Sequence, residues 1–131
     1  MIKNGFFLLP ESEAEKVISE CELQHWKIFK LPGNLSSKSE FFDGVRLTLP
    51  LDPPLASNRS WDALDDSLWS GLDSLLDENI LIIWPYVNNM RLNWVRDFEI
   101  IREIFSDLTK TISNDEFNNG SNKNIIIVGL I

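Results

Sequence analysis

The sequence predicts an α/β fold in which a small parallel sheet of three to four strands packs with helices. Short apolar runs without polar alternation, such as residues 79–84 and 125–131, are typical of strands that are buried on both faces. Longer segments with apolar residues at helical spacing separate these runs, and strands that alternate with helices form parallel sheets. A chain of 131 residues is long enough for one globular domain, which we expect to span residues 1–131.

The first strand and helix are predicted over residues 5–23. Residues 5–9 (GFFLL) indicate a buried strand that Pro10 ends. Residues 11–23 indicate a helix, with acidic residues at its start that suit the helix dipole. The apolar residues of this segment follow the i, i+3, i+4, i+7 spacing of one helical face, and they are Ala14, Val17, Ile18 and Cys21.

A second strand and helix follow. Residues 26–31 (WKIFKL) predict a strand that Pro32 and Gly33 stop. Residues 37–49 predict a helix that Ser36 or Ser37 caps, and Glu40 completes a capping box with Ser37. Its apolar side consists of Phe41, Phe42, Val45 and Leu49. The three prolines of residues 50–60 predict a loop without regular structure.

The second half of the chain predicts two more helices and two more strands. Ser60 caps a third helix that runs to about residue 76, and residues 79–84 (NILIIW) form a buried strand. A turn over residues 85–90 leads to a fourth helix at about residues 93–112. A polar loop over residues 113–124 then precedes the last strand, residues 125–131.

The charge balance excludes several classes of protein. Lys and Arg total 12 against 20 Asp and Glu, so the formal charge is −8. A nucleic-acid-binding protein and a protein that docks on anionic membranes both need a basic surface, so we expect neither nucleic acid nor a membrane as partner. This leaves a cationic partner, or none. The single cysteine, Cys21, excludes an internal disulfide, and we see neither a signal peptide nor an apolar run of about 20 residues that could span a membrane. We therefore expect a cytoplasmic protein.

The third helix carries two different faces. At about 100° per residue, one stripe is apolar and must face the core, namely Trp61, Leu64, Leu68, Leu72 and Leu75. A second stripe, about a right angle away, holds Asp62, Asp65, Asp66, Trp69 and Asp73. Residues 52–78 contain seven acids and one base, which leaves −6 of the total charge of −8 in this segment. Because like charges on one helical face repel, this concentration favours a binding role.

Three interpretations of the acidic stripe remain open. It could be an ordinary solvated face, or a binding surface in which Trp69 is an exposed anchor among the acids. Trp69 could instead fold under a neighbouring loop such as residues 50–60. Asp62, Asp65 and Asp66 could also hold Mg²⁺ or Ca²⁺, but their spacing does not match an EF-hand loop. We expect no metal and no cofactor.

Residues 61–68 (WDALDDSL) resemble the signature of the barstar family of ribonuclease inhibitors, which reads Asn-(Leu/Trp)-Asp-Ala-Leu-x-Asp-Cys-Leu. Ser60 stands for the Asn of that signature and Ser67 for its Cys. The strand that ends in Trp84, the helix that begins near Ser37, the long helix and the last strand also resemble the family. The resemblance implies a barstar-like fold with a family core at residues 26–131 and an extra strand and helix at residues 1–24.

The resemblance also implies a function. Members of the family cap the active site of a secreted or delivered ribonuclease toxin, as immunity proteins of bacterial toxin–antitoxin or contact-dependent inhibition systems. It places contact acids at Asp62 and Asp66, and a further acid of the last helix at Asp107. The expected partner is therefore a cognate basic ribonuclease, bound by a monomer in a 1:1 heterodimer. The partner-binding residues that we predict are Asn58, Arg59, Asp62, Asp65, Asp66, Trp69, Asp73 and Asp107.

The sequence departs from the family pattern beside the helix. Residues 56–58 (ASN) replace the aromatic run before the signature, Asp65 stands where an aromatic residue is common, and Trp69 stands where a small or polar residue is common. We expect no enzyme, because the single histidine, His25, lies between a predicted helix and strand as an ordinary surface or boundary residue, and no glycine-rich phosphate loop follows a strand. An acidic interaction module without a nuclease target, or a carboxylate metal-binding protein, remains the alternative.

Overall fold

A computed structural model describes residues 3–113 and 123–131 of the chain, which form four strands and five helices. The first part contains β1 (Gly5–Leu9), α1 (Glu11–Leu23), β2 (Lys27–Lys30) and α2 (Lys38–Thr48). The second part contains α3 (Trp61–Asp73), β3 (Asn79–Trp84), α4 (Asn88–Asn93), α5 (Val95–Thr111) and β4 (Asn124–Leu130). The predicted loop over residues 113–124 falls mostly on residues 114–122, which lie outside the described part.

The four strands form one parallel sheet in the order β1-β4-β3-β2. Ile82 of β3 lies at the centre, opposite Phe29 of β2 on one side and Ile127 of β4 on the other. The side chain of Asn4, just before β1, continues the pairing of β1 with β4 by accepting a hydrogen bond from the Ile125 amide at 2.9 Å. The predicted α/β fold with a small parallel sheet is therefore confirmed.

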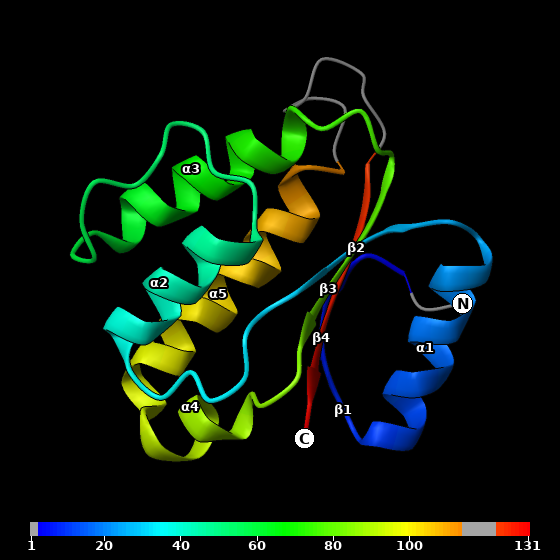
Figure 1. Ribbon diagram of the computed structural model, residues 1–131, viewed down its shortest axis with the longest axis horizontal. Coiled ribbons are helices and arrows are strands. Elements are labelled where there is room, and N and C mark those ends of the chain that lie inside the picture. The colour runs from blue at the N-terminus through cyan, green and yellow to red at the C-terminus, as the bar shows by residue number, and fades with distance from the viewer. Residues whose placement is uncertain (1–2, 114–122) are drawn as a thin grey trace.

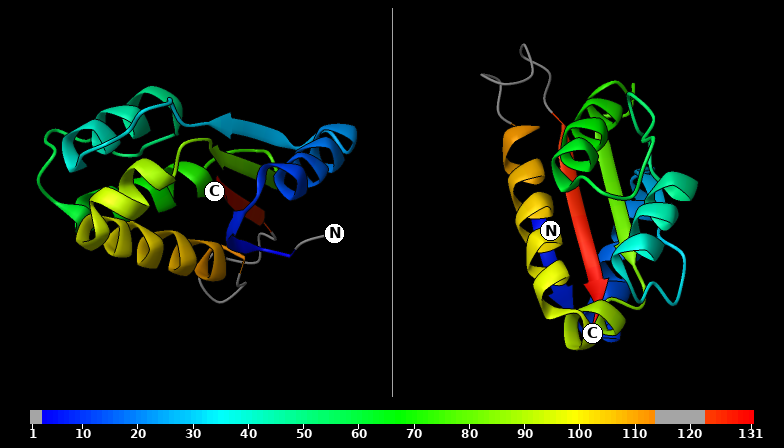
Figure 2. Two further views of the ribbon diagram at one scale, coloured as in Figure 1. Left: turned by 90° about the horizontal axis from the view of Figure 1, so that it is seen from below. Right: turned by 90° about the vertical axis from the view of Figure 1, so that its left-hand side faces the viewer.

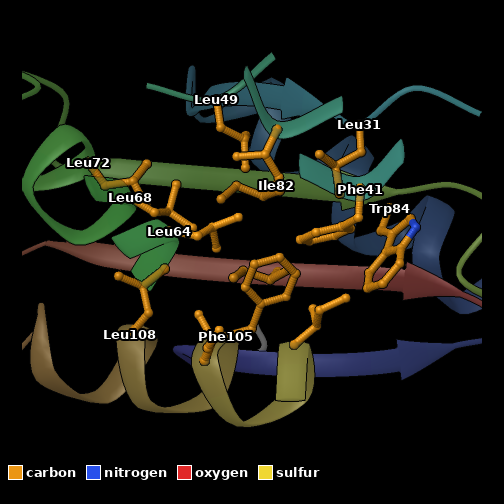
Figure 3. Packing of buried hydrophobic residues seen from close by; sticks show 14 of the residues in the cluster. Leu31, Phe41, Leu49, Leu64, Leu68, Leu72, Ile82, Trp84, Phe105 and Leu108 are labelled. Atoms are coloured by element: carbon orange, nitrogen blue, oxygen red, sulfur yellow. The ribbon is translucent and has the colours of Figure 1, made fainter. Parts of the chain in front are cut away.

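The described helices cover both faces of the sheet (Figure 1). α1 lies on one face, where Ala14, Val17 and Cys21 pack against alternate residues of β3 and β4. α2, α3, α4 and α5 lie on the other face and enclose the larger core around Ile82 and Trp84 (Figure 3). Because successive side chains of a strand point to opposite faces, both sets of β3 side chains need apolar cover. This explains why the strands show no polar alternation.

The structure corrects several predicted boundaries. The last strand spans Asn124–Leu130 instead of residues 125–131, and the second helix spans Lys38–Thr48 instead of residues 37–49. The expected turn over residues 85–90 contains the start of a short helix, α4, in which Met90 is fully buried, and Val87 just before the helix is fully buried too. A helix of six residues is too short to show a period in the sequence. β2 is one residue shorter at each end than predicted, and α3 ends at Asp73 instead of about residue 76. Beyond that end, the buried Lys123 ammonium donates hydrogen bonds to the carbonyl oxygens of Leu75 and Asp77, at 2.6 and 2.7 Å.

The start of α2 confirms the predicted cap but not the predicted capping box. The Ser37 hydroxyl accepts a hydrogen bond from the Glu40 amide at 3.1 Å. The Glu40 carboxylate accepts from the amide and hydroxyl of Ser36, both at 2.8 Å, instead of reaching Ser37. The backbone bond, followed by the hydroxyl bond, lowers the pKa of Glu40. Both candidate serines therefore take part: Ser37 accepts from the Glu40 amide, and Ser36 donates to the Glu40 carboxylate.

Candidate functional site

α3 is held in place on its apolar side by the core. The Ser60 hydroxyl caps the helix by accepting a hydrogen bond from the Ala63 amide at 3.0 Å. Leu64, Leu68 and Leu72 are fully buried toward the sheet and α5 (Figure 3). This confirms the predicted apolar stripe and leaves the acidic stripe of the helix outside the core.

The loop over residues 50–60 runs back along α3, as Figure 1 shows. The buried Ser67 hydroxyl donates a hydrogen bond to the carbonyl oxygen of Pro53, and the Ser67 carbonyl accepts one from the Asp52 amide at 3.0 Å. One turn later, a β-carbon at Gly71 would overlap the carbonyl group of Pro50, so the close approach requires glycine there. The loop therefore covers one flank of α3, while the acids lie on the opposite flank, toward α5.

The acidic face, which we define as Asp62, Asp65, Asp66 and Asp107, combines residues of two helices. Asp62 and Asp66 of α3 and Asp107 of α5 are exposed, whereas Asp65 is partly buried. Burial and then the charges of Asp66, Asp107 and Asp62 raise the pKa of Asp65. Within residues 3–113 and 123–131, none of these carboxylates has an ion-pair partner. The structure thus brings together four of the residues that the sequence analysis singled out.

Trp69 does not stand free among the acids. Its side chain is half-buried against the larger core, and its indole N–H donates a hydrogen bond to the Thr111 hydroxyl at 2.9 Å. That hydroxyl donates in turn to the Asp107 carbonyl oxygen at 2.9 Å. Of the two placements that the sequence left open, the structure shows the covered one, with α5 instead of the 50–60 loop as the hydrogen-bonding neighbour. Trp69 therefore ties α3 to α5 beside the acidic face.

Asp73 lies one turn beyond Trp69, near the end of α3. Its carboxylate is not among the charges that shift Asp65. One of its oxygens, Oδ1, is buried and accepts no hydrogen bond from the part of the chain that the structure describes. The structure therefore separates Asp73 from the acidic face, although Asp73 lies on the same stripe of α3 as Asp62, Asp65 and Asp66.

Asn58 and Arg59 lie where the loop meets α2. The Asn58 amide nitrogen donates hydrogen bonds to the Ser39 hydroxyl and to the Asp43 carboxylate, at 3.0 and 3.1 Å. The Arg59 carbonyl accepts from the Lys38 ammonium at 2.7 Å, while the Arg59 side chain is exposed. Asn58 is thus engaged in fixing the loop, whereas the Arg59 guanidinium points to solvent from a fixed backbone.

Two cations of α2 that the sequence analysis did not select hold this loop. Arg46 donates to the carbonyl oxygens of Leu55 and Ser57 at 3.2 and 3.0 Å, and pairs with Asp43 at 3.0 Å. Lys38 lies over the rings of Trp61 and Phe42, with its Nζ atom 5.2 and 5.8 Å from their centroids. Their spacing of eight residues places both on one helical face, which was the signal available in the sequence.

The described ranges lack two other features that would suggest a different role. No group of three or more His, Cys, Asp and Glu side chains there could hold a metal ion. No helix there is long and apolar enough to cross a membrane.

Comparison with known proteins connects this arrangement to one family. The family model described as barstar (barnase inhibitor) matches residues 29–120. The match begins in β2 and includes α3, α5 and every residue of the acidic face. Neither the curated proteins nor the solved structures that were searched contain a match to the chain.

Proposed function

This chain belongs to the barstar family, and on that premise we propose that it binds a cognate basic ribonuclease toxin and inhibits it by covering its active site with α3. Membership of the family implies a ribonuclease-inhibitor-like role, and the family is one of inhibitors instead of enzymes. That the partner is a cognate toxin, and that α3 covers its active site, are our proposal.

The acidic face is the observation that carries this proposal. Asp62, Asp65 and Asp66 project from one rigid helix, and Asp107 joins them from the neighbouring helix. A ribonuclease active site is a groove with positive charge that holds RNA phosphates, because phosphate contacts dominate nucleic-acid binding. Carboxylates at fixed positions can take the place of those phosphates and accept charged hydrogen bonds from Arg and Lys.

The acidic face does not stabilise the folded protein. Each pair of like charges at i+3 or i+4 on a helix costs about 0.2–0.5 kcal/mol. Burial and then the charges of Asp66, Asp107 and Asp62 raise the pKa of Asp65, so its ionised form is disfavoured in the folded chain. Repulsion between like charges that no ion pair in the folded protein offsets is typical of a binding site. A cationic partner would relieve the repulsion on binding.

The proposed partner implies several further properties of this protein. We expect a 1:1 complex in which the chain acts as an immunity protein, in the same cytoplasm as the toxin that it neutralises. The inhibitor would compete with RNA for the toxin without binding RNA or membranes itself, since its surface charge has the same sign as theirs.

Substitution of Asp66 tests the proposal. Asp66→Ala should weaken binding to the nuclease encoded by the adjacent open reading frame by about 100-fold or more, because a partner cation is left buried without its carboxylate. The matched control is Glu13→Ala, which removes an exposed acid of α1 on the opposite face of the sheet. Calorimetric titration gives the dissociation constants, and an RNA-cleavage assay gives the inhibition. Equal and small effects of the two variants would contradict the proposal.

The alternatives have their own outcomes in the same experiments. Tight binding to a basic protein without loss of RNA cleavage would identify an acidic interaction module. Specific uptake of Mg²⁺, Ca²⁺ or Mn²⁺ in a calorimetric titration of the free protein would indicate a metal-binding protein. An inhibitor should show neither behaviour.

A further inference from the structure

A shallow, open groove lies between α2 and the loop that precedes α3. It has a volume of about 610 Å³ and is lined by the side of α2 that carries Lys38 and Arg46 and by loop residues 55–59. We refer to it as the α2–loop groove. It lies outside the acidic face, which is formed by α3 and α5.

The charge of the α2–loop groove is opposite to that of the protein as a whole. Three cations line it, Lys38, Arg46 and Arg59, against one carboxylate, that of Asp43. Arg46 and Asp43 pair with each other at 3.0 Å. The remaining positive charge therefore comes from Lys38 and Arg59, in a chain whose net charge is −8.

The groove has a fixed wall from which Arg59 projects. Arg46 holds the carbonyl oxygens of Leu55 and Ser57, and Lys38 holds that of Arg59. The exposed Arg59 guanidinium itself has neither a hydrogen bond nor an ion pair within the described ranges. A cation on an anchored backbone with a free side chain can pair with an incoming anion without breaking an existing contact.

Arg59 also lies next to the proposed interface. It directly precedes Ser60, which caps α3, and Asp62 is in the first turn of that helix. The acids turn toward α5, while the groove opens beside α2, so charges of opposite sign flank the start of α3. Figure 2 shows α2 and α5 on either side of α3 in the view from the left-hand side. A partner that covers α3 would meet both charges.

We propose that the partner of the acidic face also presents an Asp or Glu side chain, which enters the α2–loop groove and pairs with Arg59. The inference rests on the proposed function, because it concerns the same partner and extends the same surface. A partner surface that is basic opposite α3 and acidic beside it would fit in a single orientation. A uniformly basic nuclease would be repelled at Arg59, so the groove would select among nucleases.

Reversal of the charge of Arg59 tests this inference through the sign of its effect. If the partner presents an acid, Arg59→Glu should weaken binding by about 10-fold or more, since two like charges then face each other. If the surface opposite Arg59 is basic, the same variant should bind more tightly. An unchanged or tighter dissociation constant would overturn the inference.

Two further variants make the result unambiguous. Lys16→Glu makes the same reversal on the exposed side of α1, across the sheet from the groove, and should leave binding within about 2-fold. Asp66→Ala, measured in parallel, reports on the proposed function. Weaker binding of Asp66→Ala together with tighter binding of Arg59→Glu would overturn the inference alone, whereas no effect of Asp66→Ala would overturn the proposed function. An Asp→Lys or Glu→Lys change in the partner that restores binding to Arg59→Glu would identify the acid.

Discussion

Asp65 illustrates at the scale of one residue how the acidic face affects stability. Its raised pKa means that the folded protein holds the carboxyl proton more tightly than the unfolded chain does. The free energy of unfolding should therefore fall as the pH rises from below the ordinary value of 3.8 through the pKa of the folded state. Ionised Asp65 thus destabilises the protein at neutral pH.

Asp65→Asn should increase the free energy of unfolding by about 0.5–1 kcal/mol at about pH 7, because it removes a charge that burial and then three neighbouring acids disfavour, at a site where water screens part of that charge. The increase should disappear at about pH 3, where Asp65 is protonated in both states. Urea unfolding at the two pH values measures both effects. The exposed Asp77, whose side chain is outside the acidic face, supplies the control Asp77→Asn. A gain of the same size at both pH values would contradict this account.

The residues of the acidic face differ in how far the sequence could predict them. The shared stripe of Asp62, Asp65 and Asp66 follows from the helical period alone. The partial burial of Asp65 does not, because it depends on how closely α5 approaches α3, which is a tertiary contact. Asp107 could be placed beside them only through the family resemblance. Trp69 stayed ambiguous, since an amphipathic indole suits either an interface or a covered site with one hydrogen bond.

At the scale of elements, the hydrogen bond from Trp69 to Thr111 connects the two helices that form the acidic face. Thr111→Val keeps the shape of the side chain but removes the acceptor, so the indole N–H loses its partner. We expect a loss of about 1 kcal/mol in the free energy of unfolding. Denaturant unfolding of this variant, of Trp69→Phe and of the double variant gives the coupling energy, which should be about 0.5–1.5 kcal/mol.

Thr48→Val is the matched control for the bridge. Within the described part of the chain, the Thr48 hydroxyl donates only to the Gly44 carbonyl of its own helix, at 2.7 Å, so its removal should change the stability by less than about 0.5 kcal/mol. Additive effects of Thr111→Val and Trp69→Phe would show that the bridge contributes no coupling.

The elements were predictable where a period or an apolar run defined them. The strand at residues 79–84 and the helix at residues 11–23 occur as predicted. α4 was missed because it is too short to show a period. The path of the loop over residues 50–60 could not be predicted for another reason. Ser67 donates a hydrogen bond to this loop and Gly71 lies against it, but in the sequence they are ordinary small residues between leucines.

At the scale of the molecule, the concentration of charge should govern the rate of association. Of the net charge of −8, −6 lies in residues 52–78. The association rate constant with the proposed basic partner should therefore fall by about 10- to 100-fold between low and high salt, as long-range attraction is screened. Stopped-flow mixing over a series of salt concentrations measures this slope. Asp62→Asn combined with Asp66→Asn should flatten it, and a rate that is independent of salt would contradict the prediction.

The architecture was predictable only in part. Alternation of strands and helices indicates parallel pairing, but it does not say which strand neighbours which. The order β1-β4-β3-β2 depends on where each connection crosses the sheet, and neighbouring apolar strands such as those of Ile82 and Ile127 offer no distinguishing side chains. The sequence assigns Asp62 and Asp107 to two different helices. Because it does not give the strand order, the helical pattern alone does not show that these two helices are neighbours.

The strand order also has a consequence for synthesis on the ribosome. β4 lies between β1 and β3, yet of the four strands it is translated last. Until it emerges, β1 has no neighbouring strand in the described sheet, and the nascent chain exposes the apolar edges of β1 and β3 that β4 will cover. Contacts between residues so far apart in sequence form slowly, as proteins of high contact order do. The nascent chain therefore remains open to aggregation until β4 leaves the exit tunnel.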